Sequence, residues 1–182
     1  MSQTNIRATA IVAFCAAFAA GFAQAADADP FRLWSPGLAD GAALPISAVY
    51  AGFGCNGGNT PPPLRWSGVP APAKSLALTV YDPDAPTGSG WWHWVATDIP
   101  VTIDRLPAAG AALTQHRNDY STRSYGGPCP PVGDKPHRYV FTLYALDVAT
   151  LEAPADASAA LIGFLLHGHT LAKTETTFVY GR

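Results

Sequence analysis

Two aspartates and two histidines occupy constrained positions in this chain and are the residues best suited to chemistry. Asp82 and Asp84 lie in the stretch YDPDAP, His93 lies between two tryptophans, and His137 follows the loop YGGPCPPVGDKP. Proline holds the residue before it in an extended conformation and lacks an N–H donor, so Asp82 is expected at the end of a strand. The glycines of the loop permit close approach of the backbone, and its prolines make it rigid. These features predict a fixed polar pocket.

Two histidines and an aspartate beside such a loop are typical of a pocket for a small oxyanion, such as a phosphate monoester or diester. Imidazoles donate hydrogen bonds and become cationic when an anion raises their pKa, and loop N–H groups add further donors. Asp82 is expected to accept a hydrogen bond from one imidazole and to fix its tautomer. Binding is therefore expected to strengthen as the pH falls towards ~6.

Other interpretations of the same residues stay open. Asp82 and Asp84 would also suit an Asx-type turn in which both carboxylates accept from backbone N–H groups, and a lone buried histidine is usually bonded to a carbonyl. A hydrolase or lyase would need a nucleophile, but Ser89 lies in a flexible GSG turn and Cys129 would be silenced by a disulfide. We therefore expect a binding protein and not an enzyme.

A metal site would draw on His167 and His169, or on His93, His137 and Asp82 together. His167 and His169 straddle the end of a predicted helix, where residues two apart do not share a face. They suit a favourable interaction with the helix dipole better than a metal ion. We expect neither a metal nor another cofactor.

The strands that must position these residues are predicted from alternation and from β-branched and aromatic content. The stretches SLALTVYD (75–82) and HRYVFTLYAL (137–146) carry apolar residues on both faces and are expected to be central strands. Further strands are expected at 92–99, 174–180, 46–51 and 63–66. Simple alternation places His93, Val95 and Thr97 on one face of their strand.

One helix is predicted within the stretch ADASAALIGFLLHGH. Asp156 or Ser158 is a suitable N-cap, and Leu161, Phe164 and Leu165 recur at helical spacing as the apolar face. The 17 glycines and 17 prolines are spread along the chain rather than gathered into a linker. That distribution favours a single β-rich domain.

The first 26 residues are expected to be a secretory signal peptide that is removed. Arg7 supplies a basic start, residues 8–21 form an apolar run, and AQA ending at Ala25 is a small-residue cleavage site. The apolar run is shorter than the ~18 to 20 residues that span a bilayer, so no membrane span is expected in the mature protein. Residues 27–182 would then form one domain in the periplasm or outside the cell.

Cleavage would leave a nearly neutral domain with two cysteines. Ten basic and thirteen acidic residues remain, with no run of Lys or Arg, which argues against a nucleic-acid partner. Cys15 is removed, and Cys55 and Cys129 are an even pair in an oxidising compartment, so a disulfide between them is expected. Two buried free thiols are the alternative.

These motifs together resemble a known family. LTVYDPDAPTGSGWWHWV, followed by GGPCPPVGDKPHRYVFTLYALD, is similar to the phosphatidylethanolamine-binding protein family and to its bacterial Raf-kinase-inhibitor-like branch. FGCNGGNTPPPLRW (53–66) resembles the N-terminal signature of that branch. The resemblance runs from about Phe31 to Gly181. It implies a mainly β, single-domain fold with a central antiparallel β-sheet, a second packed sheet and one or two short helices.

The resemblance also implies a small cavity that accepts an anion, such as a phosphate ester or a phospholipid head group. Its ligand-binding residues would be, by motif position, Asp82, Asp84, Pro86, His93, Pro131, His137 and Tyr139. Alternation along the strand points Arg138 to the opposite face, where it would be a structural partner rather than a ligand contact.

A protein partner is a further expectation. Lys135 and Pro136 precede His137 in the manner of the bacterial branch, so the resemblance gives no ground for expecting kinase inhibition. A pure interaction protein would use surface tryptophans as binding hot spots, whereas tryptophans are more often core residues or pocket walls.

Overall fold

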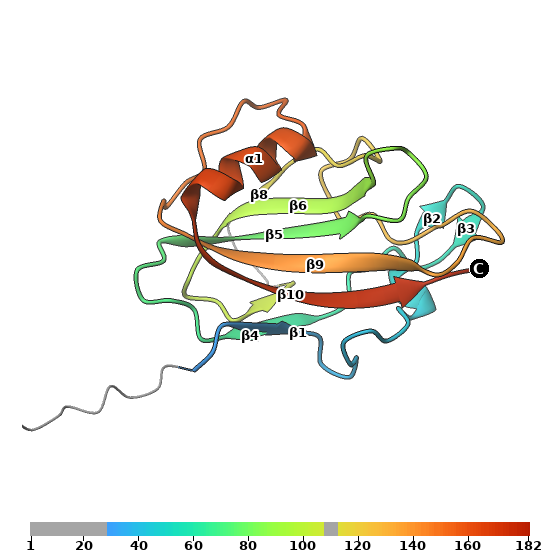
Figure 1. The fold of residues 1–182 in the computed structure, drawn as a ribbon, viewed down its shortest axis with the longest axis horizontal. Helices are drawn as coiled ribbons and strands as arrows, with labels where there is room; N and C mark the ends of the chain where they lie inside the picture. Colours follow the sequence, from blue (N-terminus) through green and yellow to red (C-terminus); the bar gives the residue numbers. More distant parts are fainter. Residues whose placement is uncertain (1–28, 108–112) are drawn as a thin grey trace, which may run out of the picture.

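The computed structural model describes residues 29–107 and 113–182, which form three layers (Figure 1). A five-stranded sheet is central, with a three-stranded sheet packed on one face and helix α1 (Ala159–His169) on the other. This confirms the expected mainly β, single-domain architecture with a second packed sheet and a short helix. The expected signal peptide, residues 1–26, lies outside the described residues.

The central sheet is antiparallel throughout and has the strand order β10-β9-β5-β6-β8. Its strands are β5 (Ser75–Asp82), β6 (Trp91–Ile99), β8 (Thr114–Gln115), β9 (His137–Leu146) and β10 (Thr170–Tyr180). The central strands predicted at 75–82 and 137–146 are confirmed with the same bounds. The strands predicted at 92–99 and 174–180 are also confirmed, although each begins earlier.

The smaller sheet has the order β1-β4-β7 and covers one face of the central sheet. Its strands are β1 (Arg32–Trp34), β4 (Leu64–Ser67) and β7 (Arg105–Leu106), and β4 corresponds to the strand expected at 63–66. Leu64 and Trp66 share a buried cluster with Leu78, Phe141 and Phe178 of the central sheet. Figure 1 shows β1 and β4 below the central sheet and α1 above it.

The strand expected at 46–51 is wrong for most of its length. Ile46–Ala48 forms a 3-10 helix (η1), and a two-residue strand, β2 (Ala51–Gly52), pairs with β3 (Cys55–Asn56). The N–H of Ala48 donates to the carbonyl of Pro45 at 2.9 Å. An amide used in such a turn is not available to a sheet, so the strand cannot begin before the turn ends.

Helix α1 begins after Ser158, whose side chain accepts a hydrogen bond from the N–H of Leu161, so one of the two expected N-caps is confirmed. The expected apolar face is wrong at two of its three residues, because Leu161 is 38% exposed and Phe164 is 73% exposed, whereas Leu165 packs against the cluster beneath the helix. Ile162 and Leu166 are buried against the central sheet instead. The helix is apolar on several sides, so spacing alone did not identify the packed side. Among the described residues, no helix is long and apolar enough to cross a membrane.

Ile162→Ala is expected to lower the free energy of unfolding by about 2–5 kcal/mol. The reason is that Ile162 is fully buried in the cluster between α1 and the central sheet, where its removal leaves a void. Urea-induced unfolding of the protein, followed by tryptophan fluorescence, measures the change.

The matched control is Phe164→Ala, two residues further along the same helix and exposed. Its effect on the free energy of unfolding is expected to stay within about 0.5 kcal/mol. A loss at Phe164 as large as the loss at Ile162 would contradict the packing of α1 against the sheet through Ile162.

Candidate functional site

A cavity of about 210 Å³ lies at the end of the central sheet where β5 ends and β6 and β9 begin. In Figure 1 this end is on the right, near the hairpin of β2 and β3 and the C terminus. Six of the seven predicted ligand-binding residues line the cavity: Asp82, Pro86, His93, Pro131, His137 and Tyr139. The fold therefore brings together residues that are up to 57 positions apart in the sequence.

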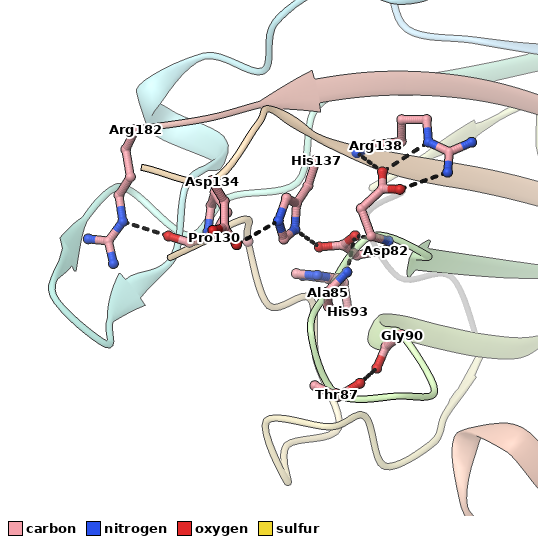
Figure 2. Close-up of polar contacts among 12 residues, drawn as sticks. Asp82, Ala85, Thr87, Gly90, His93, Pro130, Asp134, His137, Arg138 and Arg182 are labelled. Carbon is pink, nitrogen blue, oxygen red and sulfur yellow. Dashed lines mark hydrogen bonds and ion pairs between the residues drawn. The ribbon is translucent and has the colours of Figure 1, made fainter. Parts of the chain in front are cut away.

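Asp82 is buried, and its carboxylate has two tasks. Its Oδ1 accepts hydrogen bonds from the N–H groups of Asp84 at 2.8 Å and Ala85 at 3.1 Å, which is the geometry of an Asx-type turn. Its Oδ2 lies 2.7 Å from Nδ1 of His137, which donates to it (Figure 2). Asp82 therefore caps the turn and also orients an imidazole as expected, so the alternative that it serves the turn alone is wrong.

His137 lies between two carboxylates. Its Nδ1 donates to Asp82, which fixes the tautomer of the neutral ring, and its Nε2 lies 3.4 Å from Oδ2 of Asp134. The two side chains of the Asp82–His137 pair are only 4–5% exposed, whereas the side chain of Asp134 is 41% exposed. Asp82 is thus a fixed partner of His137, and Asp134 is a peripheral one.

Asp84, predicted as a second cavity carboxylate, does not line the cavity. It forms an ion pair with Arg138, with Oδ1 2.7 Å from Nη2 and Oδ2 2.9 Å from Nε. Hydrogen bonds from Arg138 lower the pKa of Asp84 to about 2. The alternation of side chains along a strand does not relate Asp82 to Asp84, because a turn follows Asp82. Arg138 has the structural role that was expected of it.

A β-bulge places His93 on the cavity side of the central sheet. The pairing of β5 with β6 shifts register between Val80 and Tyr81, which leaves His93 without a Cα partner. The ring of His93 packs edge-on against Tyr139 with centroids 5.0 Å apart, whereas Val95 belongs to the cluster beneath α1. The shared face expected for His93 and Val95 is therefore wrong, because the extra residue reverses the alternation.

His93 is neutral near pH 7. Its Nδ1 lies 2.7 Å from the carbonyl oxygen of Gly126, so Nδ1 carries the proton and donates it. Burial lowers the pKa of His93 from 6.5 to about 4, and the opposing effects of Gly126 and of the negative charge of Asp82 are weaker. The expectation that both imidazoles gain a proton near pH 6 is therefore wrong for His93.

The two adjacent glycines of the loop before β9 use their N–H groups within the protein and do not offer them to a ligand. Gly126 donates to the carbonyl of His93 at 2.9 Å, and Gly127 donates to Oδ1 of Asn59 at 2.7 Å. A Cβ atom on Gly127 would lie 2.0 Å from the carbonyl oxygen of Ala48, so only glycine permits this close approach. The expected close approach of the loop backbone is confirmed at Gly127, but the expected amide donors at these two glycines are committed elsewhere.

Cys55 and Cys129 form the expected disulfide, with their Cα atoms 6.0 Å apart. The bond joins β3 to the loop before β9 at the wall of the cavity, which Cys129 lines. The alternative of two free thiols is thereby excluded for this structure. Cys129 is also excluded as a thiolate nucleophile, since its sulfur is bonded to another sulfur.

Seven further residues of the lining were not predicted: Phe53, Ala85, Thr87, Trp91, Tyr120, Cys129 and Pro130. Tyr120 stacks on Tyr50 with centroids 4.1 Å apart, and its hydroxyl donates to the carbonyl of Gly127 at 2.8 Å. Tyr120 comes from an irregular segment without a motif that marks it, whereas Phe53 opens the stretch FGCNGGNTPPPLRW. Trp91 lies two residues before His93, and its place beside the Trp-His-Trp stretch was a usable signal.

The other histidines considered as metal ligands lie away from the cavity. His167 and His169 occupy the last turn of α1, and Nδ1 of His169 lies 2.9 Å from Oδ1 of Asp147. Their position agrees with the predicted interaction with the helix dipole. Within residues 29–107 and 113–182, no group of three or more His, Cys, Asp or Glu side chains could hold a metal ion.

Comparison with known proteins agrees with this architecture and with these motifs. Residues 34–181 match the phosphatidylethanolamine-binding protein family. The chain belongs to this family. It is similar to the UPF0098 protein YbcL of Escherichia coli K12, with 46% identity over 181 residues that cover 94% of this chain and 97% of YbcL.

Solved structures extend the similarity to the fold. The crystal structure of Escherichia coli YbcL, described as a member of the mammalian PEBP family, has a TM-score of 0.79 and 45% identity, covering 84% of this chain and 98% of that one. A PEBP homologue from Chlamydia trachomatis has a TM-score of 0.72 and 32% identity, covering 84% and 97%. A Mycobacterium tuberculosis relative named as a lipoprotein is 43% identical over 136 residues, which cover 72% of this chain and 62% of that protein.

Lowering the pH from about 6.5 to about 4 is expected to destabilise the protein through His93. In this interval the unfolded chain binds the proton and the folded protein does not, so the free energy of unfolding falls as the pH falls. The stabilisation is complete above about pH 6.5, and its loss is on the order of 3 kcal/mol at the acid end. Urea unfolding at a series of pH values measures the slope, and an NMR titration of the His93 ring measures its midpoint.

His167→Gln is the control, because His167 is exposed at the end of α1, and this variant is expected to keep the slope. His93→Gln is expected to reduce the slope. An NMR midpoint of His93 close to 6.5 would contradict the assignment of a buried neutral ring.

Proposed function

We propose that this protein is an exported binding protein that holds a small phosphate-type anion, such as a phosphate ester or a phospholipid head group, in the cavity beside His137. One observation carries the proposal. Four buried side-chain polar atoms have no hydrogen-bond partner within residues 29–107 and 113–182, and three of them, Trp91 Nε1, His93 Nε2 and the Tyr139 hydroxyl, belong to residues that line this cavity. An unpaired buried polar atom costs about 1–3 kcal/mol, so a polar ligand that pairs with these atoms is stabilised.

Tyr139 and Trp91 supply the donors that an oxyanion needs. Burial, and the negative charge of Asp82, raise the pKa of Tyr139, so its hydroxyl keeps its proton and can donate. The indole N–H of Trp91 can only donate. His137 lines the cavity beside these donors, with Asp82 holding its ring in place. Asp134 is half exposed, and its carboxylate can move away from Nε2 of His137 at little cost.

The remainder of the cavity suits the apolar part of a small ester. Pro86, Pro130, Pro131 and Phe53 line it, and proline and aromatic surfaces pack well against short alkyl groups. A volume of about 210 Å³ is below the range of pockets that hold drug-sized molecules. We therefore infer that the ligand is small, or that only the end of a larger molecule enters.

The lining favours binding without turnover. Among the described residues of the lining, Thr87 carries an aliphatic hydroxyl and Cys129 carries a sulfur. The hydroxyl of Thr87 donates to the carbonyl of Gly90, and the sulfur of Cys129 is in the disulfide, so neither is paired with a histidine base. Activation by an adjacent base is what a serine-like or cysteine-like nucleophile requires.

Export to the periplasm or the cell exterior is supported by three separate features. The first 26 residues have the sequence pattern of a signal peptide, the domain contains a disulfide, and one relative is named as a lipoprotein. A protein partner, if the ligand serves to regulate one, would meet the exposed side chains of Phe53 and Val132 beside the cavity loop.

Titration calorimetry of the mature protein with inorganic phosphate and with phosphoethanolamine tests the proposal. Saturable binding that changes the tryptophan fluorescence of the protein, with the ester unchanged afterwards by NMR, is the expected result. Absence of binding by a protein that melts cooperatively would overturn it. Release of free phosphate from the ester would instead favour a hydrolase.

Tyr139→Phe is expected to weaken phosphate binding by roughly fivefold to a hundredfold while leaving the melting temperature unchanged or higher. The hydroxyl has no partner among the described residues, so its removal breaks no internal bond and takes away only a ligand contact. Calorimetric titration and thermal melting measure the two effects.

Tyr144→Phe is the matched control, because Tyr144 is on the same strand but packs beside α1 on the other face of the sheet. Its affinity for phosphate is expected to equal that of the wild type. If both variants bind alike, the Tyr139 hydroxyl is not a ligand contact.

A further inference from the structure

The hydrogen bonds around His93 leave it with one free polar atom, and that atom is an acceptor. Nδ1 donates its proton to the carbonyl oxygen of Gly126 at 2.7 Å. A neutral imidazole carries one N–H, so Nε2 has a lone pair and no proton. Nε2 is buried and has no partner in the described parts of the chain, although the ring lines the cavity.

The groups that face His93 keep its ring neutral at physiological pH. Asp82 favours the protonated ring and His137 disfavours it, while Tyr120 and Tyr139 approach edge-on with centroids 5.5 and 5.0 Å away. Burial dominates these influences and lowers the pKa of His93 to about 4. Between pH 5 and 8, Nε2 therefore accepts hydrogen bonds and does not donate them.

Several oxygen acceptors close to His93 are already occupied. The two carboxylate oxygens of Asp82 accept from two backbone N–H groups and from His137. The carbonyl of Gly126 accepts from His93, and the carbonyl of Gly127 accepts from Tyr120. A ligand that brings a proton into the cavity can therefore give it to Nε2 of His93.

We propose that His93 selects oxyanions that carry a hydroxyl, namely hydrogen phosphate and the singly protonated phosphate monoesters, over sulfate and phosphodiesters. The proposal rests on the proposed function of the same cavity and adds the protonation state of its ligand. The hydroxyl donates to His93, and the ionised oxygens accept from Tyr139 and Trp91. The site thus recognises both the charge and the proton of its ligand.

An oxyanion without a proton would place oxygen lone pairs against the lone pair of Nε2. The contact would lack a hydrogen bond, and the buried acceptor would stay unpaired. Discrimination of roughly 10- to 100-fold is expected from the loss of one such bond. Sulfate matches hydrogen phosphate in size and charge, and dimethyl phosphate matches the single charge of a protonated monoester, so within each pair the hydroxyl makes the distinction.

Calorimetric titrations with four small probes test this selection. Inorganic phosphate and methyl phosphate carry a hydroxyl at a pH of about 5.5, below the second pKa of ~6 of a monoester, whereas sulfate and dimethyl phosphate do not. The first two are expected to bind, and the second two at least about tenfold more weakly. Equal affinity for sulfate and phosphate would overturn the selection and leave the proposed function standing. Absence of binding by all four probes would overturn the proposed function itself.

The pH dependence separates a proton on the ligand from a proton on the protein. Affinity for methyl phosphate is expected to fall roughly tenfold per pH unit above ~6, where the monoester loses its last proton. Methylphosphonate has a higher second pKa, so its midpoint is expected to move up by the same difference. A midpoint that is identical for the two ligands would assign the proton to a protein group such as His137 and overturn the proposal.

A phosphodiester head group is the probe that distinguishes a lipid head group from a free phosphate as the ligand. Glycerophosphoethanolamine has no phosphate hydroxyl but has an ammonium group, which could also donate to Nε2. Weak binding, equal to that of dimethyl phosphate, supports the hydroxyl. Tight binding would show that the ammonium of a lipid head group is the donor and would overturn the selection of protonated phosphate.

His93→Gln changes the acceptor directly. Its side-chain amide can place an N–H near the position of Nε2, so the preference for phosphate over sulfate is expected to shrink to less than about threefold. His167→Gln, exposed on α1, is expected to keep the wild-type ratio. An unchanged ratio in a folded His93→Gln protein would overturn the role of His93, and the wild-type titrations decide the question if the variant does not fold.

Discussion

The bond between Asp82 and His137 is the constraint on which the rest of the site depends. A buried carboxylate is tolerated only when its oxygens are satisfied, and Asp82 achieves this with two backbone N–H groups of the following turn and the imidazole of His137. The turn and the imidazole belong to segments 55 residues apart. One side chain therefore fixes the end of β5 against the start of β9, and the cavity lies where these two strand ends meet.

The two histidines of the cavity are held by different partners and acquire different roles. His137 is bound by a charged carboxylate, and His93 is bound by the neutral carbonyl of Gly126. The second pairing needs the loop backbone close to β6, which the N–H of Gly126 secures by donating to the carbonyl of His93. Gly127 in turn fits only because it lacks a side chain. His137 thus serves as a donor oriented by Asp82, whereas His93 is a neutral ring whose Nε2 is a free acceptor.

The sequence was most informative where a residue's role follows from its neighbours in the chain. The central strands, the turn at Asp82, the pairing of Cys55 with Cys129 and six of the thirteen lining residues were predictable, and the family motifs identified them jointly. Three features could not be predicted from the sequence, because each depends on tertiary packing. A bulge at His93 reversed the alternation, the sheet selected Ile162 as the packed side of α1, and Arg138 drew Asp84 away from the cavity. Tyr120 reaches the site from an irregular segment that no local pattern identifies.

The cavity is also where this protein departs from the packing rules that the rest of its core obeys. Buried polar atoms are nearly always paired in folded proteins, and an unpaired one costs about 1–3 kcal/mol. Three such atoms on residues of a single cavity are a concentrated cost, since an apolar lining of the same shape would avoid it. Departures of this kind are expected at functional sites, where stability is given up for recognition. Cys129 of the disulfide and Asp82 line the same cavity as these unpaired atoms. Their bonds therefore stabilise the part of the protein in which the unpaired polar atoms cost stability.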